Sequence, residues 1–348
     1  MIGISQLLLD WFAINRRELP WRETSDPYKI WISEIILQQT RIAQGLSYYL
    51  RFIKRFPDVK SLALANEDEV LRYWQGLGYY SRARNLHATA QIITNEYNGC
   101  FPTNFKEIKA LKGIGDYTAA AILSIAFKLP YAVVDGNVYR VLSRVFEIDT
   151  AIDSSKGKRE FFELAQELLD KKNPDLYNQA MMDLGAMVCM PSNPLCINCP
   201  LKTICQSFQN GSYDNFPVKE KKTKQKDRYF VYVYLHDQEK IYLHRRNEKD
   251  IWTGLYEFPM IELNSPLWEE EFSLFMKEIQ KLFNLVDVKE ITTMPNHILS
   301  HQIIHSVFID AIGTISTQNK SKFITINDDE LENYAIPRLL ELYLEKRK

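Results

Sequence analysis

Two kinds of hydrophobic pattern follow one another along the chain. Over residues 3–205 apolar side chains mostly recur with helical spacing, and prolines interrupt the pattern. After this region, Tyr229–His236 and Ile241–Arg246 alternate apolar and polar side chains and predict a β-hairpin, while Trp268–Phe283 predicts an amphipathic helix. The sequence therefore predicts a mainly α first domain and an α+β second domain.

A glutamate interrupts one strongly apolar segment. Apolar positions surround most of the helix predicted over residues 28–41, which indicates that this helix is buried. The neighbours of Glu34 one helical turn away include Ile30 and Leu37, and only Gln38 is polar on that face. Burial disfavours a charged carboxylate, so we expect the pKa of Glu34 to be raised toward neutrality. A solvated glutamate is the usual alternative, and the apolar surroundings argue against it.

A tight turn with two glycines is predicted over residues 111–116, ahead of an apolar helix over Tyr117–Phe127. Gly113 and Gly115 let backbone N–H groups point outward together at the start of that helix. Such a turn can bind a phosphate of a nucleic acid backbone without reading any base. A plain connection between two helices explains the same residues equally well.

Asp135 occupies the predicted N-cap of the helix that follows. Helix-end N–H groups favour negative charge, so the sequence predicts a lowered pKa and an ionised carboxylate for Asp135. A capping role alone is the ordinary explanation of such a residue. Glu34 and Asp135 nevertheless form a pair in which one carboxyl is expected to hold a proton and the other a charge. That pairing can protonate a leaving group and stabilise a developing cation.

The loop Gln75–Tyr80 is flanked by glycines and precedes a helix start that carries Arg82 and Arg84. A tip bearing Leu77 and Tyr79 could enter a base stack while the two arginines contact phosphates. An ordinary turn before an amphipathic helix is the alternative, and these residues taken alone favour it.

Four of the five cysteines fall within 17 residues, with six, two and five residues between them: Cys189, Cys196, Cys199 and Cys205. The sequence shows no secretory signal, so a cytoplasmic setting is expected, which disfavours disulfides and leaves zinc or an iron–sulfur cluster. Zinc sites usually divide their ligands into two close pairs. A single close pair with outliers on both sides favours an iron–sulfur loop, for which a structural role is the simplest interpretation.

The charge of the 348-residue chain is distributed unevenly. The formal net charge is −1, but it falls from +2 over residues 1–210 and +3 over residues 211–226 to −6 over residues 227–348. The lysine run between Lys219 and Lys226 is expected to be a solvated linker, and total charge gives no indication of a nucleic-acid partner. Neither a secretory signal nor a membrane-spanning segment is expected. We therefore expect a cytoplasmic protein with no membrane partner, and a monomer.

The combined motifs resemble a known family. The helix–hairpin–helix turn, the aspartate downstream of it and the cysteine spacing resemble the DNA glycosylase superfamily that includes endonuclease III. Within it, four segments resemble adenine DNA glycosylases of the MutY type: Pro20–Arg22, Ser33–Thr40, Gly76–Tyr80 and Val134–Val138. The likeness is close over residues 1–205 and loose beyond. It implies a helical glycosylase domain of two lobes over residues 1–210, a basic linker over 211–227 and a Nudix-like lesion-recognition domain over 228–348.

The resemblance also implies an activity. It implies a monofunctional enzyme of base excision repair that hydrolyses the N-glycosidic bond of adenine opposite 8-oxoguanine or guanine in double-stranded DNA, with a 4Fe-4S cluster on the four cysteines. Glu34 is then the general acid, and Asp135 faces the sugar cation. Endonuclease III-like enzymes have a nucleophilic lysine at the position of Tyr117, where tyrosine cannot form a Schiff base. The other DNA contacts expected in the first domain are Arg22, Gln39, Thr40, Leu77, Tyr79, Gly113, Gly115, Tyr117 and Asn137.

The second domain carries a weaker resemblance. Trp252–Pro259 resembles the segment that precedes the Nudix signature of nucleotide hydrolases, but the metal-binding glycine and glutamate cluster that should follow is missing. We therefore expect a Nudix-like domain without hydrolase activity. Leu299 stands where the family has the phenylalanine of a Phe-Ser-His lesion-reading loop, so Ser300 and His301 are expected lesion contacts. Histidines at four-residue spacing, His297 to His305, could suggest a metal site, but the β-rich setting argues against one.

Three other functions stay open at this point. They are an endonuclease III-like glycosylase/lyase for oxidised pyrimidines, a non-enzymatic iron–sulfur protein that binds damaged DNA, and a Nudix hydrolase with an appended helical domain. Tyr117 argues against the first, and the missing metal-binding cluster argues against the last.

Overall fold

The computed structural model of the chain describes residues 3–220, 225–247, 249–266, 275–277, 279–280 and 282–347. Its contacts divide the chain into two compact units, Met1–Leu64 with Asn85–Lys222 and Ala65–Arg84 with Thr223–Lys348. The loop Gln75–Tyr80 thus belongs to the second unit. Most of the basic run falls on residues 221–224, which lie outside the described residues.

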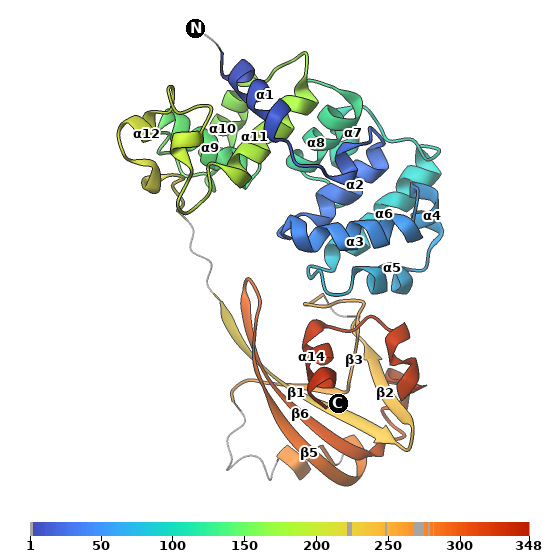
Figure 1. Ribbon diagram of the computed structural model, residues 1–348. Helices are drawn as coiled ribbons and strands as arrows, with labels where there is room; N and C mark the ends of the chain where they lie inside the picture. The colour runs from blue at the N-terminus through green and yellow to red at the C-terminus, as the bar shows by residue number, and fades with distance from the viewer. Residues whose placement is uncertain are drawn as a thin grey trace. The chain divides into compact units, whose positions relative to one another are not determined.

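The first unit is helical (Figure 1). No helix in the described ranges is long and apolar enough to cross a membrane. Short 3-10 turns, among them η1 (Pro20–Arg22), connect some of the helices. The helices are α1 (Ile4–Asn15), α2 (Pro27–Ile36), α3 (Ile42–Arg55), α4 (Val59–Leu64), α7 (Phe105–Ala110), α8 (Asp116–Phe127), α9 (Gly136–Phe146), α10 (Ser155–Leu168), α11 (Pro174–Met187) and α12 (Gln206–Gln209), and α6 (Ser81–Glu96) runs into this unit from the second.

Helices α2 and α8 form the buried centre of one half of this unit. Both are apolar around most of their circumference: every residue of Ile30–Ile36 and of Thr118–Ser124 is buried. The predicted helix over residues 28–41 is too long, because α2 ends at Ile36. Gln39 has a φ of 59°, and a right-handed helix cannot continue through that conformation.

A second core joins α1, α9, α10 and α11. Leu8 and Phe12 of α1 pack with Leu142 of α9, Phe161 of α10 and Leu184 of α11. The sulfur-bearing side chains of three loop cysteines pack against the edge of the same cluster. This core therefore fixes both the N-terminus of α9, where Asp135 lies, and the loop that carries the cysteines.

The C-terminal part of the second unit is built on a mixed sheet (Figure 1). The strand order is β3-β2-β1-β6-β5, with β4 paired to β1 and β7 paired to β2. β1 and β6 are parallel, and the other pairs are antiparallel. The strands are β1 (Lys226–Asp237), β2 (Lys240–Arg245), β3 (Tyr256–Glu257), β4 (Met260–Leu263), β5 (Phe283–Ile298), β6 (Gln302–Ile315) and β7 (Ile324–Asn327). Helices α5 (Glu67–Trp74) and α14 (Arg338–Arg347) belong to the same unit.

Alternate residues of β1 face two separate cores. Tyr232 and Tyr234 pack with α14 through Tyr343, while Val231 and Val233 face a cluster on the other side of the sheet. The predicted hairpin of residues 229–246 is confirmed by the pairing of His236 with Ile241. Part of the helix predicted over Trp268–Phe283 lies outside the described residues, and residues 275–277 and 279–280 are helical. The prediction of a mainly α and an α+β domain is confirmed.

Candidate functional site

The general-acid candidate lies at the contact between α2 and α8. Glu34 of α2 is 8% exposed, and the Tyr117 hydroxyl, in the first turn of α8, donates a hydrogen bond to Glu34 Oε2. Burial raises the pKa of Glu34 to about 7, and the nearby Asp135 adds to the rise, while the Tyr117 hydrogen bond and Arg22 oppose it. Burial also raises the pKa of Tyr117 well above its usual value, so its hydroxyl keeps its proton. The predicted rise of the Glu34 pKa is confirmed.

Asp135 caps α9 as predicted, but its pKa moves in the direction opposite to the prediction. Its Oδ1 accepts the Val138 backbone N–H at 2.8 Å, and its Oδ2 accepts Asn137 Nδ2 at 2.8 Å. Burial nevertheless raises the pKa of Asp135 above its ordinary value, and these hydrogen bonds with the charge of Arg140 offset only part of the rise. The prediction of a lowered pKa is wrong, because tertiary burial outweighs the favourable helix end.

A buried arginine holds the capping residues in place. Arg140 Nη2 donates to Asn137 Oδ1 at 2.8 Å and to the Gly185 carbonyl at 2.7 Å. Its Nε donates to the carbonyl of Cys189 at 2.7 Å. Asn137, which donates to Asp135, is therefore tied both to α11 and to the first residue of the cysteine loop.

One cavity of about 470 Å³ joins these side chains, and its size is ordinary for a pocket that holds a small organic group. Glu34 and Asp135 both line it, although they lie far apart in the sequence. The other predicted site residues that line it are Arg22, Thr40, Tyr117 and Asn137.

The remaining predicted DNA contacts of this unit lie in two turns. Gln39 is exposed at the turn after α2. Gly113 has a φ of 80°, and a Cβ at this position would lie 2.7 Å from the Asn85 Cβ, so the turn requires glycine. Gly115 is the N-cap of α8, and a Cβ there would meet no atom within 4 Å. The predicted turn is thus present, and its binding of phosphate stays a prediction.

The cysteines surround a second, small pocket of the first unit. Cys189, Cys196, Cys199 and Cys205 all line it together with Arg144. Arg144 Nη1 donates to the Cys189 sulfur at 3.5 Å, and the Cys205 thiol donates to the Arg144 carbonyl at 3.5 Å. Within the described ranges, no three His, Cys, Asp or Glu side chains surround a position for a single metal ion.

The lesion-contact candidates meet in the second unit. The Tyr79 hydroxyl and Ser300 Oγ share a hydrogen bond, and both residues line a cavity of about 490 Å³ with His301. Tyr79 is 46% exposed, but Leu77 is only 7% exposed. The Leu77 N–H donates to the Trp74 carbonyl, which turns the chain inward at this point. The sequence suggests that Leu77 projects from the loop tip, but its side chain is buried instead.

The loop Leu299–His301 is held by its own backbone. The Leu299 N–H donates to the Gln302 carbonyl at 2.8 Å, and the Leu299 side chain packs against the core beneath α14. Leucine thus serves as the apolar anchor of this loop. The histidine spacing does not form a metal site, because the His305 ring pairs with Asp227 at 2.7 Å while the His297 ring packs edge-on against Trp252.

Comparisons with known proteins identify the family of the chain. Residues 32–170 match the HhH-GPD superfamily base excision DNA repair protein, and residues 230–346 match the NUDIX domain. An adenine DNA glycosylase of Buchnera aphidicola subsp. Baizongia pistaciae is 35% identical over 95% of this chain and 93% of its own length. The chain belongs to the adenine DNA glycosylase family. The adenine DNA glycosylase of Mus musculus is 29% identical over 98% of this chain and 78% of its own length.

Solved structures support the fold of this adenine DNA glycosylase family member. A thermostable thymine-DNA glycosylase aligns with a TM-score of 0.55 and 30% identity, over 59% of this chain and 95% of that protein. Endonuclease III in a non-covalent DNA complex aligns with a TM-score of 0.52 and 22% identity, over 60% of this chain and 94% of that protein, which concerns the fold alone. The predicted family, enzyme class and fold class are confirmed.

Some residues of the glycosylase cavity escaped the sequence analysis. Arg17, Gln179 and Met182 line it, and Asp183 lies directly behind it in α11. The available signal was a pair of polar residues, Gln179 and Asp183, four positions apart in a helix with many apolar residues. That spacing places both on one face of α11, and both are buried.

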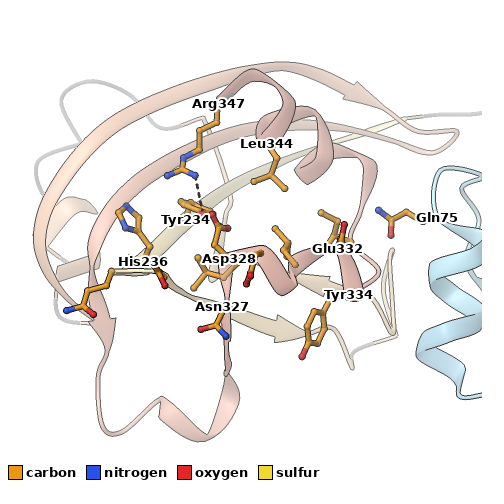
Figure 2. Close-up of a pocket in the computed structure, with 15 residues that line it drawn as sticks. Gln75, Tyr234, His236, Asn327, Asp328, Glu332, Tyr334, Leu344 and Arg347 are labelled. Carbon is orange, nitrogen blue, oxygen red and sulfur yellow. Dashed lines mark hydrogen bonds between the residues drawn. The ribbon is translucent and has the colours of Figure 1, made fainter.

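Another cavity of the glycosylase, of about 920 Å³, lies in the second unit (Figure 2). Its polar groups pair with one another: Arg347 Nη1 donates to the Tyr234 hydroxyl at 3.2 Å, and that hydroxyl donates to Asp328 Oδ1 at 2.8 Å. No residue predicted as a site residue lines it. This cavity is therefore separate from the candidate site.

The close contact of Gly185 with the capping residues of α9 gives a testable prediction for the glycosylase. A Cβ at position 185 would lie 2.5 Å from the Asn137 Cβ and 3.0 Å from the Asn137 Cα and carbonyl oxygen. We expect Gly185→Ala to lower the free energy of unfolding by about 1–3 kcal/mol, because overpacking must displace the start of α9. Thermal unfolding measures this change.

The matched control is Gly136→Ala in the same helix start. A Cβ at Gly136 would meet nothing within 4 Å, so this change should leave the unfolding temperature near that of the parent. Equal unfolding temperatures for Gly185→Ala and the parent would contradict the role assigned to this contact.

Proposed function

We propose that this protein is a monofunctional glycosylase that hydrolyses the N-glycosidic bond of adenine opposite 8-oxoguanine or guanine in double-stranded DNA. The observation that carries the proposal is that Glu34, with a pKa of about 7, and Asp135 line one cavity. Tyr117 lies in the same cavity, where the lyase enzymes of the superfamily have a lysine.

The reaction begins with adenine leaving the base stack and entering the cavity of about 470 Å³. Unstacking costs a few kcal/mol, roughly, and costs least at a mispair. Helix ends and the turn at Gly113 and Gly115 hold the backbone phosphates, which position the duplex without reading its sequence. Gln39 and Thr40 contact the duplex beside the extruded nucleotide.

Glu34 supplies the proton that makes adenine leave. Its pKa of about 7 keeps a large share of the carboxyl protonated near neutral pH, which matches a general acid to its working range. The proton passes to N7 of adenine, the bond between C1′ and N9 breaks, and its electron pair goes to the base. Tyr117 holds the Glu34 carboxyl through its hydroxyl.

Asp135 stabilises the sugar cation that remains. Its carboxylate is fixed by the Val138 N–H and by Asn137, so it need not reorganise as positive charge develops at C1′. Water then adds to C1′ and gives up a proton to a carboxylate of the cavity. The product is an abasic site with both DNA strands intact, because Tyr117 cannot form a Schiff base with the sugar.

Recognition of the oxidised guanine falls to the second unit. Tyr79 is exposed and shares a hydrogen bond with Ser300, and His301 lines the same cavity. Leu77 of the same loop is buried, so Tyr79 is the one of the two that is available to the duplex. The Nudix-like domain thus reads the base opposite adenine and has no hydrolase activity. A monomeric state and a cytoplasmic location stay predictions.

The four cysteines form a donor set that fits a 4Fe-4S cluster. Thiolates are the usual ligands of such clusters, and each binds a different iron, so the ligands stand around a pocket instead of meeting at one point. The cluster would supply structural order and no step of base excision. Arg144 would hold Cys189, and Arg140, which bonds both to the Cys189 carbonyl and to Asn137, would transmit that order to Asn137.

The central test is base release from a duplex with adenine opposite 8-oxoguanine. The parent protein should give an abasic site whose strand breaks only after alkali. Glu34→Gln should abolish base release while it preserves DNA binding, because it keeps the shape and removes the proton. Gel analysis of an end-labelled duplex measures both. Strand breakage without alkali would instead indicate a lyase, and full activity of Glu34→Gln would remove this residue as the acid.

The pKa of Glu34 predicts a pH dependence. A general acid works in its protonated form, so the single-turnover rate constant should be greatest below pH 7 and should fall about tenfold per pH unit well above it. A rate constant that stays level from pH 7 to pH 9 would be inconsistent with the proposed acid.

The cysteine loop predicts the metal content. The purified protein should be brown and contain about four irons per chain. Cys199→Ser should lose colour and iron, whereas Cys100→Ser, a change at an exposed cysteine outside the loop, should keep both. Iron analysis and visible absorption measure the outcome. A colourless preparation that contains zinc would refute the cluster.

A further inference from the structure

Behind the catalytic cavity lies a fully buried aspartate with two arginine partners. The Asp183 side chain is 0% exposed, and it accepts Arg22 Nη1 at 2.7 Å on Oδ2 and Arg22 Nη2 at 2.8 Å on Oδ1. Arg17 Nε donates to Oδ1 at 2.9 Å. Burial acts to raise the pKa of Asp183, but the hydrogen bonds from Arg22 and Arg17 outweigh burial and lower it. Asp183 is therefore ionised, with a two-point grip on Arg22.

The hydrogen bonds to Asp183 engage only some of the N–H donors of the Arg22 guanidinium. Nη1 also donates to the Arg17 carbonyl at 3.2 Å, so both Nη1 hydrogens have acceptors. Among the described residues, no acceptor meets Nε–H or the second Nη2–H of Arg22. The Arg22 side chain is 11% exposed and lines the cavity that contains Glu34. Two donors are thus available to acceptor atoms of a base in that cavity.

Arg22 has other carboxylates within reach of its charge. Glu34 faces Tyr117, Asp135 and Arg22, and the positive charge of Arg22 favours its ionised form. Arg17, Arg41 and Arg140 also line the cavity. An Arg22 side chain released from its partner would be drawn to Glu34 or Asp135, since these are the acidic residues that line the cavity. Glu34 would then lose the proton that base release requires.

We propose that Asp183 is a positioning residue, which fixes the Arg22 guanidinium in the cavity wall and keeps it from pairing with Glu34. Two N–H donors of Arg22 then remain for the extruded adenine. The inference rests on the proposed function for its catalytic consequence, and on the hydrogen bonds to Asp183 for its geometry. A buried ion pair adds little net stability relative to apolar packing, so a positioning role accounts for the pair better than stability does.

Asp183→Asn is the direct test, because it keeps the size of the side chain and removes its charge. The single-turnover rate constant for adenine release opposite 8-oxoguanine would be measured from pH 5.5 to pH 8.5. We expect the basic limb of the pH–rate profile, where the rate constant falls with rising pH, to move about one pH unit lower. Adenine release then slows about tenfold at pH 8 and much less at pH 6. Asp183→Glu should restore most of the parent profile. In an Arg22→Gln background, Asp183→Asn should cause no further shift.

The matched control is Asp310→Asn in the second unit. Asp310 is also buried and is paired with Arg347 at 2.8 Å and His236 at 2.9 Å, outside the catalytic cavity. Its loss should leave the basic limb in place. A limb that is unmoved in Asp183→Asn, with only a lower unfolding temperature, would show that Asp183 is merely structural and would overturn the proposal.

A second measurement does not need activity. Infrared titration of the protonated carboxyl band, taken as parent minus Glu34→Gln without DNA, follows Glu34 directly. In Asp183→Asn this band should disappear at lower pH than in the parent. Failure of the parent to release adenine would refute the proposed function, whereas an unmoved band would refute the role of Asp183. If Asp183→Asn does not fold, Arg22→Lys replaces it, because lysine cannot form the two hydrogen bonds to Asp183. The Glu34 band should then shift in the same direction, and an unmoved band in Arg22→Lys would also refute the role of Asp183.

Discussion

The burial of one carboxyl group between α2 and α8 governs the chemistry of the first unit. Both helices are apolar around most of their circumference, so a glutamate placed between them is removed from water. The same packing that stabilises this half of the unit raises the pKa of Glu34 to about 7. The stability of this half and the acid strength of Glu34 therefore have a common origin. The Tyr117 hydroxyl donates a hydrogen bond to the carboxyl group that this packing removes from water.

Much of this could be predicted from the sequence, because the signals were local. The all-round apolar pattern of α2 was sufficient to predict the raised pKa of Glu34, and the β-hairpin followed from strict alternation. The N-cap position of Asp135 was also a local signal, but the direction of its pKa shift was not. That direction depends on burial by residues far away in the sequence, which outweighs the hydrogen bonds at the start of α9.

Residues whose importance depends on partners elsewhere were missed for the same reason. Asp183 lies in a helix whose sequence gives no sign that Arg17 and Arg22 converge on it. The burial of Leu77 similarly depends on a backbone turn that its glycine-rich neighbours made hard to foresee. Where a side chain's role was set by its own helix or strand, the sequence was enough; where it was set by convergence, coordinates were needed.

The parallel pairing of β1 with β6 bears on how the protein is made. These strands are far apart in the sequence, and Tyr343 of α14 stacks on Phe308 of β6 with ring centroids 4.1 Å apart. On the ribosome, β1 emerges before α14, which completes the cover over the aromatic side chains of this strand. The nascent sheet must therefore remain soluble until α14 has been synthesised and packs on it.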